Sequence, residues 1–93
     1  MTTFFMFGKY STEGVSEISQ ERTARAIEII EDSGGAVTAM YAVLGQHDLI
    51  LIVELPELKD AMAVSIELNR LTGLSFITTP AVEVEAFDKM VTS

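Results

Sequence analysis

The sequence predicts an α+β domain whose elements follow the order β-α-β-β-α-β. Three observations support this order. Four apolar segments rich in β-branched and aromatic residues are typical of strands. Two segments with helical periodicity separate the first strand from the second and the third from the fourth. A polar four-residue connection joins the middle two strands, as in a β-hairpin. No linker or low-complexity tract divides the 93 residues, so one domain is expected over residues 1–93.

The first strand is expected over Thr3–Tyr10 and the first helix over Ser19–Ser33. The strand is short, aromatic and apolar, and the turn-like residues "STEG" follow it. Ser19 is a suitable N-cap, and the pair Gly34-Gly35 supplies the left-handed conformation that ends many helices. The residues predicted to face the core from this helix are Thr23, Ala24, Ile27 and Ile30.

The hairpin is expected to pair Ala36–Leu44 with Leu49–Glu54 through Gly45-Gln46-His47-Asp48, a connection of suitable length and chemistry. A second helix fits Glu57–Thr72, because Pro56 precedes it and Gly73 follows it. The end of the chain predicts a last strand and a short terminal helix, over Leu74–Glu85 and Ala86–Val91 respectively.

This order is that of the ferredoxin-like fold, in which an antiparallel sheet has its first and third strands at the centre and its second and fourth at the edges. The central strands, "FFMF" and "LILIV", have the nearly continuous apolar character of strands that are buried on both faces. Pro80 falls in the fourth strand, where an edge position tolerates its missing backbone donor. Both details agree with the predicted strand order.

The sheet face that the helices leave uncovered is expected to bind a partner. Both helices of the fold cover the same face, so the other face should be polar if it meets water. Neither alternation of the first three strands is polar, and an apolar face of that size aggregates unless something covers it. A second copy packed through a two-fold axis is the simplest cover. We therefore expect a homodimer whose two sheets form a barrel-like sandwich, and the wide apolar arc of the second helix favours a higher oligomer.

Composition limits the other partners. The chain carries 14 acidic and 6 basic residues, a formal charge of −8, and its basic residues are scattered. Such a surface repels nucleic acid and anionic membranes, and no apolar run approaches the roughly 18 residues of a membrane span. The absence of cysteine and of a signal-peptide pattern suits a cytoplasmic protein. We expect no nucleic-acid or membrane partner and no cofactor.

Three segments carry a resemblance to a known family. They are "FMFGKYSTEG" (residues 5–14), "GG" at 34–35 followed by "AVTAMY", and "LGQHDLILIVELP" (residues 44–56). In order and spacing they resemble the GYD domain family of the dimeric α/β-barrel superfamily. The family's Gly-Tyr-Asp triplet falls on Gln46, His47 and Asp48, so only Asp48 is kept. The resemblance implies the fold and the dimer, but no reaction.

The candidate catalytic residues are His47 and Asp48. His47 is the only histidine, and an imidazole can act as a general base or bind a metal. The alternative is a hairpin-turn residue that packs its ring at the end of the barrel, and this interpretation is favoured. Asp48 is more often a turn residue whose carboxylate accepts backbone amides. One imidazole without cysteines or paired acids predicts no metal site.

Lys9, Tyr41 and Asn69 are the candidate ligand-binding residues, because each polar group lies near apolar surfaces. Lys9 could instead be a strand-end charge, or pair with Glu54. Asn69 falls inside the apolar arc of the second helix, where a buried amide needs a hydrogen-bond partner. A bond to the backbone or to the dimer mate would satisfy it, and so would a position at a pocket mouth.

Two functions from different classes remain open. The preferred one is a small-molecule binding or assembly module that holds a small apolar ligand. The alternative is an enzyme similar to the cofactor-independent oxygenases and isomerases of the superfamily, which act on aromatic or other apolar substrates. Fold analogy alone supports the enzyme. His47 facing an enclosed cavity together with Tyr41 or Lys9 would favour it.

Overall fold

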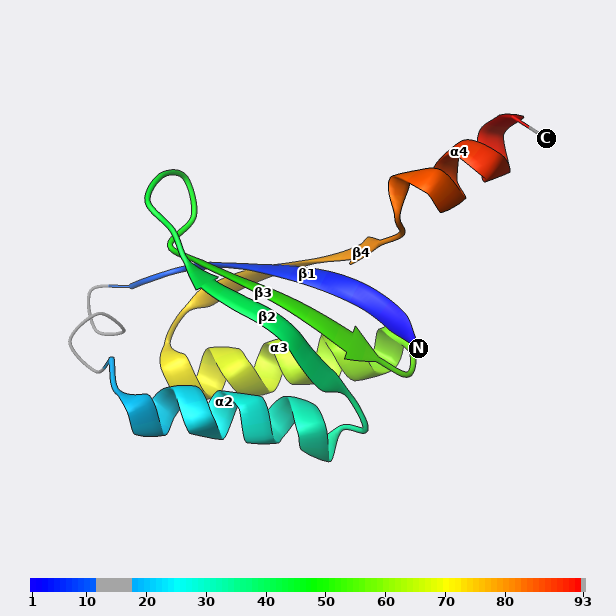
Figure 1. The fold of residues 1–93 in the computed structure, drawn as a ribbon. Coiled ribbons are helices and arrows are strands. Elements are labelled where there is room, and N and C mark those ends of the chain that lie inside the picture. The colour runs from blue at the N-terminus through cyan, green and yellow to red at the C-terminus, as the bar shows by residue number, and fades with distance from the viewer. Residues whose placement is uncertain (12–17, 93) are drawn as a thin grey trace.

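The computed structural model describes residues 1–11 and 18–92 as an α+β domain (Figure 1). The turn expected at "STEG" falls mainly on residues 12–14, outside the described residues. The elements, in chain order, are β1 (Thr2–Lys9), α2 (Gln20–Asp32), β2 (Ala36–Ala42), β3 (Leu49–Leu55), α3 (Leu58–Thr72), β4 (Ser75–Ala81) and α4 (Val84–Thr92).

The four strands form one antiparallel sheet in the order β2-β3-β1-β4. The predicted ferredoxin-like arrangement is confirmed, with the first and third strands at the centre. Pro80 lies in the edge strand β4, opposite Phe4. A register irregularity at Thr38 interrupts the pairing of β2 with β3, which is characteristic of a β-bulge.

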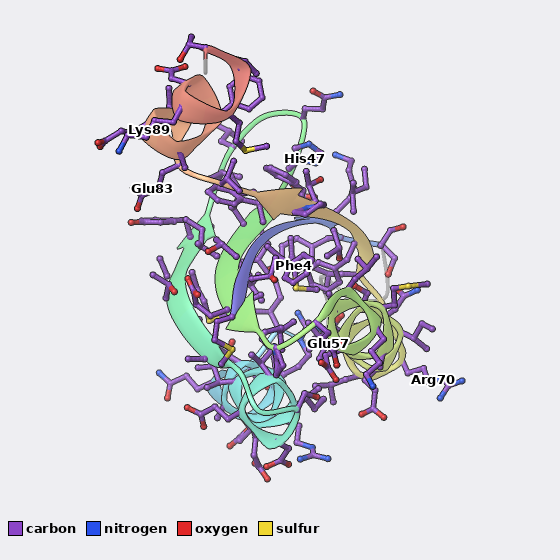
Figure 2. All side chains as sticks on the ribbon, turned by 90° about the vertical axis from the view of Figure 1, so that its right-hand side faces the viewer. Phe4, His47, Glu57, Arg70, Glu83 and Lys89 are labelled. Carbon is purple, nitrogen blue, oxygen red and sulfur yellow. The ribbon has the colours of Figure 1, made fainter. Side chains whose placement is uncertain are left out.

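Helices α2 and α3 lie side by side under one face of the sheet, and the core fills the space between these layers (Figure 1). The central strands supply alternate residues to it, because successive side chains of a strand point to opposite faces. Phe4, seen between the sheet and the helices in Figure 2, is 1% exposed. Each such side chain stabilises the fold by about 1.5–3 kcal/mol. The largest buried side chains are Phe4, Met6, Ile30, Leu51, Leu55, Leu68 and Leu74.

The ends of α2 agree with the prediction from the sequence, but its buried face agrees only in part. Ser19 caps the helix by accepting the Arg22 N–H at 3.0 Å, and Gly34 follows it with φ +84°. The buried residues are Ala26, Ile29 and Ile30. Of the predicted face, Ile30 is buried and Ile27 partly buried, whereas the prediction was wrong for Thr23 and Ala24, which are exposed. The apolar side chains of α2 span more than half of the helix circumference at 100° per residue, so helical periodicity alone did not show which part of that arc is buried.

The C-terminal region also differs from the prediction. β4 ends at Ala81, and α4 begins at Val84, two residues before the terminal helix was expected. The alternation "AVEVE" imitates a strand in the sequence. In the structure Val84 and Glu85 instead form the first turn of α4.

The sheet face opposite the helices, which we call the open face, is apolar over its two central rows, whereas its ends carry the hydrogen-bonded pair Thr3 and Glu54 and the exposed Lys9. Its side chains form rows across all four strands, as the register defines. The first row is Tyr41, Ile50, Phe7 and Ile77, and the second is Ala39, Ile52, Phe5 and Thr79. Tyr41 and Ile77 are 58% and 60% exposed. The single chain therefore leaves a continuous apolar surface in contact with water.

Candidate functional site

A pocket of about 150 Å³ opens between the sheet and the helices, at the end where α2 begins and α3 ends. The folding of the core creates it, since α2, α3 and the strands β2, β3 and β4 all contribute walls. Ala26 is the small residue that α2 presents there, and Leu68 projects from α3. The remaining apolar walls come from Ile18, Met40, Ala42, Leu49, Leu51, Leu74 and Phe76.

Polar groups gather at one side of this pocket. They are Tyr10, Arg22, Thr23 and Thr72. The Arg22 guanidinium lies 5.9 Å from the centre of the Tyr10 ring, a cation–π distance, and its Nη1 donates a hydrogen bond to the Thr72 carbonyl at 3.3 Å. The pocket thus combines apolar walls with one anchored cation, which is the usual composition of a small-ligand site.

Asp48 contacts the backbone of Tyr10, one of these polar residues. Its Oδ2 accepts the Tyr10 backbone N–H at 2.9 Å, and its own N–H donates to the Gly8 carbonyl at 2.9 Å. These bonds join the β2–β3 loop to the end of β1, from which Tyr10 extends into the pocket wall. Asp48 therefore acts through the backbone, as the turn interpretation expects, and it positions a residue of the pocket.

His47 lies elsewhere. Its ring packs against Phe7 with ring centres 4.9 Å apart and planes tilted by 35°. Phe7 belongs to the open face, and Figure 2 shows His47 on that side of the sheet, across it from Phe4. His47 is absent from the pocket lining. The structure therefore does not unite the two predicted catalytic residues around one cavity.

The three candidate ligand-binding residues are also dispersed. Lys9 Nζ is 3.8 Å from Asp48 Oδ2 and 60% exposed, so this surface pair contributes little to stability. Tyr41 borders the pocket, while its register opposite Ile50 assigns its side chain to the open face. Asn69 is exposed on α3, so its amide is not buried and does not need a partner within the protein. Only Tyr41 adjoins the pocket.

Arg22 is the residue of the pocket that the sequence-based search missed. Its signal was present, because Arg22, Ala26 and Ile29 follow one another at helical spacing, and a cation on a buried helix face is unusual. Because the predicted buried face of α2 included Thr23 and Ala24, Arg22 was not recognised as part of that face. Within residues 1–11 and 18–92, no cluster of three metal-ligating side chains occurs. No helix among those residues has the length and apolarity to span a membrane.

Solved structures share this fold. The Mycobacterium tuberculosis Leucine response regulatory protein (LrpA) aligns with a TM-score of 0.64 and 13% identity, over 88% of this chain and 51% of that one. The AsnC family transcriptional regulator from Agrobacterium tumefaciens aligns at 0.58 and 19%, over 88% and 50%. This chain spans about half the length of these regulators. FFRP-DM1 is matched over its full length, with 88% of this chain covered, a TM-score of 0.60 and 25% identity.

No functionally curated protein is significantly similar to the chain. The GYD domain model, however, matches residues 4–91. That match includes the pocket, the open face and nearly all of α4. The chain belongs to the GYD domain family.

Proposed function

We propose that this protein is a homodimeric binding module for a small apolar molecule. The observation that carries the proposal is the pocket between α2, α3 and the sheet, with its apolar walls and Arg22 at one side. A protein of this size has a small hydrophobic core, so an unfilled cavity of this kind reduces the stability of the fold. A ligand that fills it recovers contacts that the core lacks.

The pocket limits the ligand's size and chemistry. An apolar cavity of about 150 Å³ accepts a molecule the size of benzene. Arg22 would pair with a carboxylate, while Leu68 and Phe76 would contact the apolar part. Small aromatic acids and branched aliphatic acids fit this description. One fold relative is named as a leucine response regulator, and leucine belongs to the same chemical class.

The open face supports the dimer part of the proposal. Its two rows place Phe5, Phe7, Ile50 and Ile52 at the centre of an apolar surface. A second copy stacked on that surface would remove it from water at a gain of about 25 cal/mol per Å². Two sheets stacked at about 10 Å form the predicted barrel. The ligand pocket remains on the helix side of each sheet.

Binding is preferred over catalysis because of where His47 lies. A general base must reach the proton that it removes, and His47 packs on the opposite face of the sheet from the pocket. The polar groups of the pocket include the Arg22 guanidinium and the Tyr10 phenol, and these two suit recognition of a carboxylate. The hydroxyls of Thr23 and Thr72 donate to backbone carbonyls of their own helices.

Isothermal titration calorimetry with leucine, isovalerate and benzoate tests the proposal. At least one probe should bind with a Kd of about 0.1–1 mM, which is reasonable for so few atoms. Ala26→Leu should fill the pocket and weaken binding by about tenfold or more, at a folding cost of about 1–3 kcal/mol. Arg22→Gln should weaken carboxylate binding by a similar factor.

Ala24→Leu is the matched control, because Ala24 lies on the exposed side of the same helix and is absent from the pocket lining. This variant should bind like the wild type. If no probe binds, or if Ala26→Leu and Ala24→Leu bind equally while both are folded, the pocket is not the binding site.

A further inference from the structure

Helix α4 is amphipathic and has no buried side chain. Its polar side carries Glu85 and Lys89, which form an i,i+4 ion pair at 3.6 Å. Its apolar side carries Val84, Phe87 and Val91 at i, i+3 and i+7, beside Met90. Phe87 is 51% exposed and Val84 73%. A nine-residue helix is too short to be stable in water without packing, so its apolar side indicates a missing partner surface.

The position of α4 shows where that surface should lie. Figure 1 shows α4 standing away from the rest of the chain, on the open-face side of the sheet and opposite α2 and α3. Figure 2, turned by 90°, again places Lys89 of α4 on that side, far from Arg70 of α3. The radius of gyration, 14.0 Å, exceeds the roughly 12 Å of a compact chain of this length. The helix therefore extends toward the space that a second copy would occupy.

A matching apolar surface is present on α3. Leu58, Met62 and Ile66 follow one another at i, i+4 and i+8 and are 60%, 61% and 54% exposed. They form one wall of a groove whose other wall includes Phe76 of β4. The polar groups of the groove, Ser65 and Thr78, are hydrogen-bonded to each other. The groove thus offers an apolar surface without an unsatisfied hydroxyl.

We propose that α4 is an exchanged arm, which packs Phe87 and Val91 into the α3–β4 groove of a second copy. The arm's reach agrees with this, because nine helical residues extend about 13 Å and stacked sheets lie about 10 Å apart. An arm that rises from one sheet therefore passes the level of the partner sheet. The exchange rests on the proposed dimer. It also explains why two unpartnered apolar stripes occur in one chain.

The chain contains no cysteine, so introduced cysteines report the contact directly. The single variants Phe87→Cys and Met62→Cys are co-expressed and oxidised, and a disulfide between them can only join two chains. Glu67→Cys replaces Met62→Cys in the control, because Glu67 is exposed and lies about 140° around the same helix. The disulfide between the cysteines introduced at positions 87 and 62 should form about tenfold faster than the control disulfide, since docking raises the effective thiol concentration.

The double variant Phe87→Cys/Met62→Cys separates the two places where the arm can pack. Covalent dimers on a non-reducing gel support the exchange, whereas a disulfide within one chain means that α4 folds onto its own α3 and overturns it. Equal rates of disulfide formation with Met62→Cys and with Glu67→Cys also overturn the exchange. Light scattering of the wild type distinguishes the failures: a dimer without the cross-link refutes the arm alone, and a monomer refutes the dimer as well.

Discussion

The Asp48 carboxylate accepts the backbone N–H of Tyr10 at 2.9 Å, across a separation of 38 residues. This bond holds the β2–β3 loop against the end of β1, and the Tyr10 ring in turn lies against Arg22 in the pocket wall. A residue that looks like a simple turn residue therefore also orders one side of the candidate site.

Asp48→Ala should remove this link and leave the Tyr10 N–H without its partner. The free energy of unfolding should fall by about 1–3 kcal/mol, as measured by urea denaturation. Binding of benzoate should weaken as well, because Tyr10 loses its position. Asp48→Asn keeps an acceptor oxygen and should lose less. Equal losses for Ala and Asn would show that the hydrogen bond is not what Asp48 contributes.

Gly35→Ala should destabilise the fold, because a Cβ there would overlap the Glu54 carbonyl oxygen and lie 2.6 Å from Leu55 Cδ2. Backbone cannot move aside, so the expected cost is about 3 kcal/mol. Gly8→Ala is the comparison, since its Cβ would meet side-chain atoms of Phe76 and Leu74 at 2.8 and 3.1 Å. Side chains can adjust, and the cost should be nearer about 1 kcal/mol. Thermal denaturation followed by circular dichroism gives the order, and the reverse order would contradict the packing described here.

His47→Gln should leave probe binding unchanged within about twofold, because His47 packs on Phe7 and not in the pocket. Calorimetry with the same acids provides the measurement, with Arg22→Gln as the variant that should lose affinity. A loss with His47→Gln comparable to that with Arg22→Gln would return this histidine to the site and reopen the catalytic alternative.

The sequence predicted the topology because its strongest signals are local. Ser19, Gly34 and Gly73 mark helix ends through backbone chemistry, and the structure places each of them at such an end. The boundary between β4 and α4 was less predictable, because "AVEVE" satisfies the alternation of a strand. Only the packing of the chain decides between the two, and α4 buries no side chain within its own chain.

The candidate site was harder to predict than the fold. A pocket is the space between elements, so no single motif encodes it. Its lining joins Tyr10, Arg22, Leu51 and Thr72, which lie far apart in the sequence. Sequence reasoning was drawn to His47, the rarest residue type in the chain. It passed over Arg22, whose side chain becomes notable only once the buried face of α2 is known.

Light scattering of the wild type and of Phe5→Glu tests most directly the claim that a second copy covers the open face. Phe5 lies in the second row of that face, and Leu44, fully exposed in the β2–β3 loop, provides the control Leu44→Glu. The wild type and Leu44→Glu should have twice the chain mass of 10.1 kDa, and Phe5→Glu should be a folded monomer by circular dichroism. If Phe5→Glu does not fold, Tyr41→Glu at the edge of the same face provides the same comparison. A monomeric wild type, or folded open-face variants that remain dimeric, would show that no second copy covers this face.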